Sequence, residues 1–347
     1  MSYSCHTLFS ERSPHEHDNG FFFRQLGMGV ALALALASLS LVQAQSSGTG
    51  STLVRDLMAS WTAQHGQTVG GAKYEPSGSS AGIAVARDGT ADFGITDVPL
   101  TAAALQQGNL RQIPLAGAAV AVIVNLPELG GKPIKLTGDI LASIYLGEIT
   151  QWNHSQITAA NPGLPLPARA ITPVWRSDGS GQSYVFSSYL ARSNSKWRRT
   201  PGTSNSLSQL AGRGVRGGAA VIEAVKATPG AIGYDSLGAA QKAQLAVAEL
   251  RNASDKFIAP SAASINEALS QARWAADSLS ADLDGSPGVN SYPMTAVPYA
   301  LISGNRKGGV NPVAFFKAAV SGGDAQVTQN GFVPLPASAK NLVLQVR

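Results

Sequence analysis

The stretch Trp175–Leu190, WRSDGSGQSYVFSSYL, places a cation and an acid ahead of a glycine-rich turn and an amphipathic run. The residues AITPVWR (170–176) predict a strand that delivers Arg176, and the run after the turn predicts a helix. The first N–H groups of a helix have no partner inside it, and together with the helix dipole they attract an anion. Arg176 adds a planar fork suited to two oxygens. The stretch therefore predicts half of an oxyanion site on an α/β fold.

Two further glycine turns resemble this one. GTGSTLV opens a predicted helix, STLVRDLMASWTAQHG (51–66), whose apolar residues share one face and which we expect to stop at Gly66. PSGSSAG sets Ser79 and Ser80 at the head of a short predicted helix. One glycine-serine turn before a helix is usually a plain cap. Several such turns with a nearby arginine favour an oxyanion site.

Apolar runs that suit strands alternate with amphipathic helical stretches along the rest of the chain, which indicates an α/β architecture. No low-complexity linker separates the two halves of the chain. The predicted strands are ADFGITDVPL (91–100) ending near Asp97, AVAVIVNLP (119–127), and MTAVPYALIS (294–303) with an edge or bend at Pro298. ILASIYLGEITQW (140–152) predicts a helix followed by a turn, and VIEAVKATPGAIGYDSL (221–237) predicts a helix, a turn at Pro229-Gly230 and a strand. NPVAFFKAAVSGG (311–323) predicts a further helix.

The N-terminus has the pattern of an export signal. An apolar core, GMGVALALALASLSLVQA (27–44), ends in small residues that match an A-x-A-like cleavage site at Ala44. The apolar run is shorter than the roughly 20 residues that span a bilayer. We therefore expect residues 1–44 to be a signal peptide and the mature protein to be periplasmic or secreted. The single cysteine, Cys5, lies inside this leader, so we expect no disulfide in the mature chain.

Composition excludes several classes of function. The chain holds 26 Lys and Arg and 21 Asp and Glu residues; removing residues 1–44 takes away two cations and three anions, so the mature net charge is +6. This mild basicity suits an anionic ligand, but no Lys/Arg run is dense enough for a nucleic-acid site. His65 and His154 are the only histidines after the leader, and no phosphate-binding P-loop occurs. We expect no metal and no cofactor.

One pattern favours an enzyme. Gly78–Gly82 spells G-x-S-x-G, which would make Ser80 a hydrolase nucleophile at a strand-to-helix elbow. A hydrolase of that fold needs a histidine late in the chain, and none follows His154. We therefore expect no catalysis, and a secreted serine-type phosphatase or esterase on this scaffold stays an alternative.

Seven motifs occur together in an order and spacing that resemble one family: GTGSTL, SGSSAG, ADFGITDVPL, GEITQWN, NPGLPLP, RSDGSGQSYVFSSYLA and PGAIGY. The chain resembles the periplasmic phosphate-binding proteins of phosphate ABC importers, which are type II periplasmic binding proteins. The resemblance implies a two-lobed clam shell with a mixed sheet and flanking helices in each lobe. Lobe one would comprise residues 45–118 and 297–347, and lobe two residues 119–296. It also implies a monomer that delivers inorganic phosphate to a membrane-embedded permease.

The resemblance assigns the phosphate-binding residues one by one. Arg176 is similar to the cationic clamp. By its chemistry and not by the resemblance, Asp178, two residues on, can accept from that guanidinium and hold it in place, and a role as a turn or helix cap stays an alternative. Asp97 is similar to the carboxylate that touches the anion. The other donors that the resemblance implies are the hydroxyl and amide of Thr52, the backbone N–H of Leu53, the hydroxyl of Ser79, and the helix-start groups of Ser180, Gly181 and Gln182.

Two of these residues bear on which anion is bound. Phosphate near neutral pH carries a proton that Asp97 can accept, whereas fully ionised sulfate has none and would be repelled. Gln182 departs from the family, which usually has threonine at this position. Glutamine keeps the N–H and lacks the hydroxyl, so a binding protein for another tetrahedral oxyanion, such as arsenate, stays an alternative.

Overall fold

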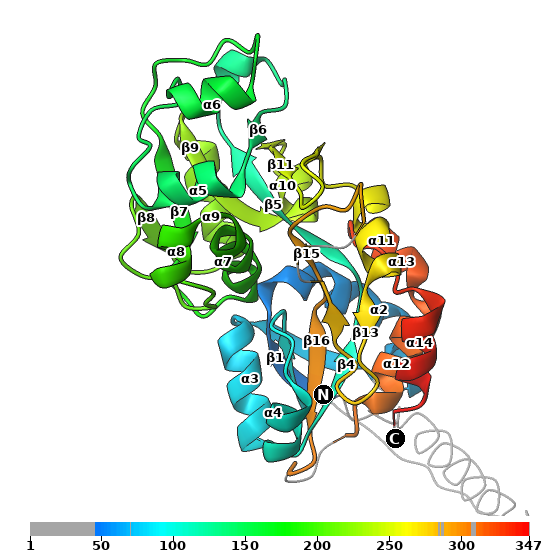
Figure 1. Ribbon diagram of the computed structural model, residues 1–347. Helices are drawn as coiled ribbons and strands as arrows, with labels where there is room; N and C mark the ends of the chain where they lie inside the picture. Colours follow the sequence, from blue (N-terminus) through cyan, green and yellow to red (C-terminus); the bar gives the residue numbers. More distant parts are fainter. Residues whose placement is uncertain (1–45, 70, 284, 286–287, 307–309, 347) are drawn as a thin grey trace, which may run out of the picture. The chain divides into compact units, whose positions relative to one another are not determined.

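The computed structural model describes residues 46–69, 71–283, 285, 288–306 and 310–346. The signal peptide expected from the sequence and the single cysteine lie outside the described residues. Within these ranges, two mixed sheets flanked by helices form the α/β architecture that the sequence predicts (Figure 1). The described part of the chain holds no helix that is long and apolar enough to cross a membrane.

The first sheet has the strand order β2-β1-β3-β16-β4. Its strands are β1 (Ser46–Gly50), β2 (Ala72–Pro76), β3 (Phe93–Thr96), β4 (Leu110–Pro114) and β16 (Tyr299–Ser303). Its helices are η1 (Thr52–Val54), α2 (Arg55–Val69), α3 (Ser79–Asp88), α4 (Ala102–Gln107), α12 (Val313–Gly322), α13 (Asp324–Gln329) and α14 (Ala337–Leu344). Strand β1 pairs in parallel with β2 and β3, and β16 runs antiparallel to β3 and β4. Helices α3 and α4 lie on one face, and α2, α12 and α14 on the other (Figure 1).

The second sheet has the order β10-β5-β9-β7-β8, with β15 paired to β5. Its strands are β5 (Ala118–Val124), β7 (Thr172–Arg176), β8 (Arg213–Val215), β9 (Ala231–Ser236), β10 (Ala246–Val247) and β15 (Thr295–Ala296). Its helices are α5 (Gly138–Tyr145), α6 (Ser155–Ala160), α7 (Gly181–Ser193), α8 (Ser195–Arg199), α9 (Gly218–Ala227) and α10 (Leu237–Lys242). All residues of β5 are buried, as its unbroken apolar run AAVAVIV predicts.

Smaller elements complete the described chain. They are β6 (Lys135–Leu136), β11 (Glu249–Arg251), β12 (Phe257–Ile258), β13 (Arg273–Trp274), β14 (Ala281–Asp282), η2 (Pro127–Leu129) and α11 (Ala262–Gln271).

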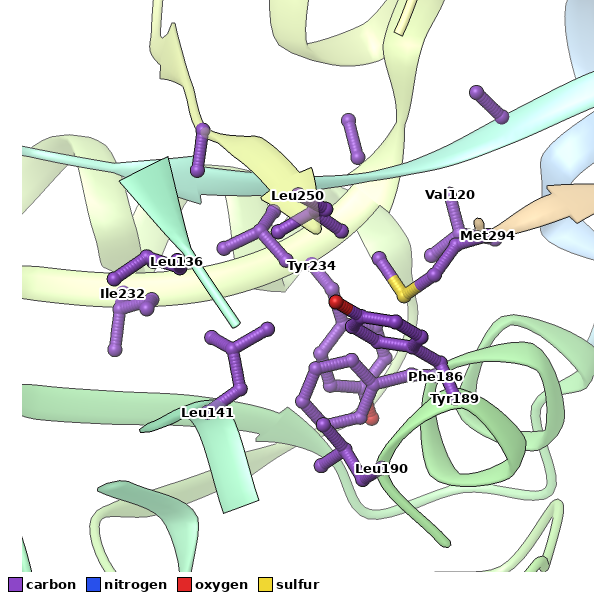
Figure 2. Close-up of a cluster of buried hydrophobic side chains, with 14 of the residues drawn as sticks. Val120, Leu136, Leu141, Phe186, Tyr189, Leu190, Ile232, Tyr234, Leu250 and Met294 are labelled. Atoms are coloured by element: carbon purple, nitrogen blue, oxygen red, sulfur yellow. The ribbon is translucent and has the colours of Figure 1, made fainter. Parts of the chain in front are cut away.

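A cluster of buried aromatic and aliphatic side chains lies between α7 and the second sheet. Figure 2 shows Phe186 and Leu190 of α7 packed with Tyr234 of β9 and Leu141 of α5. The rings of Phe186 and Tyr234 stack with centroids 4.2 Å apart and planes 14° from parallel. Tyr234 also exchanges a 2.7 Å hydrogen bond with the hydroxyl of Ser183, so the core holds the first turns of α7 against β9.

Two adjacent segments connect the sheets. The chain passes from β4 to β5 through residues 115–117 and returns from β15 to β16 through residues 297–298. The N–H of Leu115 donates to the carbonyl of Pro298 at 2.9 Å, so the two segments lie side by side. Proline has no N–H for a ladder, and the strand predicted over residues 294–303 divides at Pro298 as expected.

One predicted boundary is wrong. Helix α2 continues through Gly66 to Val69, and its first turn is the 3₁₀ helix η1. Glycine inside a helix costs about 1 kcal/mol relative to alanine, so packing has to offset that cost. The hydroxyl of Thr62 donates to the carbonyl of Ala72 at 2.9 Å, which ties the last turns of the helix to β2.

Candidate oxyanion-binding site

The predicted site residues lie where strands end and helices begin. Strands β1 and β3 are parallel, so residues that follow them lie at the same edge of the first sheet: Ser51 and Thr52 follow β1, and Asp97 follows β3. Arg176 ends β7 in the second sheet, and the turn after it leads into α7. The structure brings residues from both sheets together, because Arg176 Nη1 donates to Thr52 Oγ1 at 3.2 Å.

Asp97 is buried among hydroxyl groups. Ser51 Oγ and Ser79 Oγ both donate to Asp97 Oδ2, at 2.8 and 3.4 Å. The other carboxylate oxygen, Oδ1, is buried and has no hydrogen-bond partner among the described residues. Burial raises the pKa of Asp97 to about 6 against the combined effect of the Ser51 hydrogen bond and the charge of Arg176, which lower it. Asp97 can therefore exchange a proton near neutral pH.

Gly181 allows the helix start of α7 to approach this carboxylate. A Cβ atom at Gly181 would lie 2.5 Å from the Cβ of Asp97 and 2.6 Å from Ser79 Oγ, closer than such contacts permit. Ser180 caps the helix, since its hydroxyl accepts from the N–H of Ser183 at 3.4 Å. The N–H groups of the first helical turn have no acceptor inside the helix. These donors consequently lie beside Asp97.

Arg176 is held by a carboxylate at the strand end. Its side chain is 1% exposed, and Nε and Nη2 donate to Oδ1 and Oδ2 of Asp178 in a two-point contact. The N–H of Gly217 also donates to Asp178 Oδ1, at 3.0 Å. Burial works to lower the pKa of Arg176, but the hydrogen bonds and charge of Asp178 outweigh it and raise that pKa. Burial likewise works to raise the pKa of Asp178, and Arg176 and Gly217 outweigh it and lower that pKa.

Gln182 connects Arg176 to a third carboxylate. Its Oε1 accepts from Arg176 Nη1 at 2.8 Å, and its Nε2 donates to Asp235 Oδ1 at 2.9 Å. Asp235 is 4% exposed, and burial raises its pKa despite the hydrogen bonds from Gln182 and Ser236. The glutamine side chain thus takes part in the buried network around the arginine.

The comparison with known proteins assigns the chain to a family. Residues 37–316 match the family model described as the PBP superfamily domain. Over 304 residues the chain is 35% identical to the phosphate-binding protein PstS of Xylella fastidiosa strain 9a5c, an alignment that covers 86% of this chain and 83% of that protein. The chain belongs to the phosphate-binding protein PstS family. The PstS protein of Haemophilus influenzae strain Rd is 34% identical over 301 residues, covering 85% of this PstS-family chain and 90% of the relative.

Solved structures confirm the fold expected for a PstS-family chain. A high-affinity periplasmic phosphate-binding protein, PfluDING, bound with phosphate matches with a TM-score of 0.68 at 22% identity, covering 86% of this chain and 92% of that one. An ABC-type phosphate transport receptor from Vibrio cholerae matches with a TM-score of 0.54 at 21% identity, covering 84% and 100%. The two-lobed α/β architecture inferred from sequence is therefore that of the family.

The glycines around Ser80 serve the turn and the packing of α3. Gly78 has a φ of +106°, a conformation that favours glycine. A Cβ at Gly82 would lie 2.2 Å from the carbonyl oxygen of Ile95, so α3 packs directly on the backbone of β3. The hydroxyl of Ser80 accepts from Asn205 Nδ2 at 3.1 Å, and His154 caps the distant helix α6. The G-x-S-x-G pattern thus has a structural explanation in this PstS-family chain.

Sequence reasoning missed Ser51 and Asp235. Ser51 lies next to Thr52 in the first glycine turn, and its hydroxyl serves both Asp97 and, as acceptor, the N–H of Leu53 at 3.1 Å. Asp235 ends the apolar run GAIGY, and β9 is parallel to β7. Asp97, which the family resemblance selected, follows an apolar strand, and Asp235 lies near the end of another, so this shared position is a signal that could have found Asp235. In the described chain, groups of three or more His, Cys, Asp and Glu residues that could hold a metal ion do not occur.

Proposed function

We propose that this chain binds inorganic phosphate and delivers it to the permease of an ABC importer, without catalysis. The observation that carries the proposal is that a buried cation, Arg176, and a buried carboxylate, Asp97, lie at one donor-lined site, where the charge of Arg176 acts on the pKa of Asp97. A cation alone would suit any oxyanion, whereas a buried carboxylate with an unpartnered oxygen suits an anion that carries a proton. Phosphate carries that proton near neutral pH. Membership of the PstS family supports the same ligand.

The donor shell that we propose surrounds the phosphate on both sides. Arg176 would bind from the second sheet, together with the helix-start N–H groups of α7, because an anion in a buried site needs each oxygen paired. Arg176 Nη1 and Thr52 Oγ1 lie 3.2 Å apart, so both groups can donate to one oxygen of an anion that lies beside them. The proposed set comprises Thr52, Leu53, Ser79, Asp97, Arg176, Ser180, Gly181 and Gln182, with Asp178 holding the arginine.

We assign residues 45–118 and 297–347 to lobe one and residues 119–296 to lobe two. The two adjacent connections at 115–117 and 297–298 support this division, because they are short and lie beside each other. Rotation about such a pair of segments would open and close the site, as in other hinge motions. The closed form would then present the surface that the permease recognises.

The proposed signal peptide would place this protein outside the cytoplasm. Residues 1–44 would direct the chain out of the cytoplasm, and cleavage after Ala44 would leave a monomer in the periplasm or outside the cell. The description of PfluDING as a periplasmic phosphate-binding protein agrees with this location. The membrane-embedded partner would be the permease of a phosphate importer.

Calorimetric titration of the mature chain tests the proposal. The protein is unfolded and refolded to remove bound anion, then titrated at pH 7.5 with phosphate, arsenate and sulfate. One-to-one binding of phosphate with no response to sulfate is the expected result. Equal binding of phosphate and sulfate would contradict the role of Asp97. Binding of arsenate without binding of phosphate would show that the ligand is the other tetrahedral oxyanion.

A second assay separates binding from hydrolysis. The protein is incubated with a chromogenic phosphate monoester, and released phosphate is measured for the wild type, Ser80→Ala and Arg176→Ala. No turnover is expected in any of them. Turnover that vanishes with Ser80→Ala and survives Arg176→Ala would establish the hydrolase instead.

A further inference from the structure

We infer that Asp235 is a positioning residue for the anion site, acting through the Gln182 amide on the guanidinium of Arg176. The inference rests on the proposed oxyanion-binding function and names a determinant of it. Arg176 and Asp235 lie near the ends of β7 and β9, which are neighbouring parallel strands. Gln182, in the first turn of α7, reaches both of them.

The polarity of the amide follows from its two neighbours. Arg176 offers N–H donors only, and the Asp235 Oδ1 atom already accepts from the N–H of Ser236 at 2.6 Å. If the amide were reversed, its NH₂ would face the guanidinium and its oxygen would face the carboxylate. Both contacts would then be repulsive. Asp235 therefore keeps Gln182 Oε1 directed at Arg176.

This orientation decides which donors Arg176 can offer to an anion. Nε and one N–H of Nη2 bind Asp178, and the two N–H groups of Nη1 bind Gln182 and Thr52. Within the described residues, the second N–H of Nη2 has no acceptor in these contacts. The hydroxyl of Thr52 accepts one N–H of Arg176 Nη1 and can itself donate. A bound anion can therefore accept from both that N–H and the hydroxyl. Gln182 and Asp178 thus direct the remaining donors toward the Thr52 side.

The cost of burying Asp235 argues for a functional role. Its Oδ2 atom is buried and lacks a hydrogen-bond partner in the described part of the chain. A Cβ at Gly218, the first residue of α9, would lie 2.4 Å from this oxygen, so the helix start packs against it. An unsatisfied buried carboxylate oxygen destabilises a fold. The start of α9 and the two hydrogen bonds to Oδ1 offset part of this cost, and orienting Gln182 supplies a further reason for the acid.

A double-mutant cycle tests the inference. Gln182→Met, Asp235→Val and the double variant are titrated with phosphate by calorimetry at pH 7.5; methionine keeps the backbone N–H and the approximate length of glutamine but has neither an amide nor a hydroxyl. Each single change leaves a buried polar group without its partner, so each should weaken phosphate binding by about tenfold or more. The double variant removes both members of the hydrogen bond between the side chains of Gln182 and Asp235. It should bind at least about tenfold more tightly than the product of the two losses predicts.

A conservative variant and a matched control separate positioning from stability. Asp235→Asn retains the Oδ1 acceptor and should restore most of the affinity that Asp235→Val loses. Asp139 is a half-buried acid near the start of α5 that accepts from Asn194 Nδ2 at 2.7 Å, outside the anion site. Asp139→Val should lower the midpoint of urea unfolding without weakening phosphate binding.

Each failure has its own signature. Losses that simply add in the double variant, or a loss in Asp235→Asn as large as that in Asp235→Val, would overturn the inference. A wild type that binds no phosphate would instead overturn the proposed function. The positioning role is then read from ¹⁵N NMR of the anion-free protein: Asp235→Val should shift the Arg176 side-chain signals and the Gln182 NH₂ signals, whereas Asp139→Val should not. Unshifted signals would refute it.

Discussion

Replacing Asp97 by asparagine should stabilise the anion-free protein at neutral pH. Burial raises the pKa of Asp97 from an ordinary value of 3.8 to about 6 in the folded state. The folded protein therefore binds this proton more tightly than the unfolded chain, and its stability falls as the pH rises from 3.8 through 6. The difference corresponds to about 3 kcal/mol above pH 6. Asparagine cannot ionise, so the Asp97→Asn variant should escape this loss.

Urea unfolding of anion-free protein between pH 4 and 8 measures the effect. The expected free energy of unfolding of Asp97→Asn exceeds that of the wild type by up to about 3 kcal/mol at pH 7.5, and the two nearly converge at pH 4. Asp88→Asn, an exposed change near the end of α3, is the matched control and should follow the wild type. A gain below about 0.5 kcal/mol at pH 7.5, or one independent of pH, would refute the reasoning.

Three further changes test the site and its support. As the pH falls below about 6, protonation of Asp97 should allow the wild type to bind sulfate, and calorimetry at pH 5 and 7.5 that shows no gain would contradict this. Arg176→Ala should weaken phosphate binding by about 2–5 kcal/mol in the same assay, since it removes one partner of a buried charge pair; a loss under about 1 kcal/mol would exclude the clamp. Phe186→Ala should lower the free energy of unfolding by about 3–5 kcal/mol, because the ring stacks on Tyr234 in a buried core. A loss below about 1 kcal/mol in urea denaturation would show that the packing of this ring contributes little to stability.

Sequence patterns within one segment correctly predicted the strands and helices whose packing in the fold matches those patterns. The unbroken apolar run of β5 is buried along its whole length, and the turn before α7 begins a helix at Gly181. The end of α2 was not predictable in the same way. Gly66 is a stop signal by composition, but the helix continues to Val69, and one turn before Gly66 the hydroxyl of Thr62 bonds to Ala72 of β2. A local signal does not include such contacts with the rest of the fold.

The same distinction applies to the site. Arg176 and Asp178 are two residues apart at a strand end, so their pairing followed from the sequence. The contact between Gln182 and Asp235 joins residues 53 positions apart and depends on β7 and β9 being neighbours. Asp97 accepts from the predicted hydroxyl of Ser79 and, at the shorter distance, from that of Ser51, which occupies the N-cap position of η1. Sequence identifies hydroxyl-rich turns, and the cap geometry decides which hydroxyl faces the acid.

The direct contact between α3 and β3 bears on mutational tolerance. A Cβ at Gly94 would lie 1.8 Å from the carbonyl oxygen of Gly82, and a Cβ at Gly82 would lie 2.2 Å from that of Ile95. One added methyl group at either position must push the helix away from the strand, and Ser79 leaves Asp97 with it. In a saturation library selected for growth on scarce phosphate, these two glycines should be as intolerant as the acid itself. Gly82 and Gly94, which have no side chain, would then be as important for phosphate binding as the polar residues of the site.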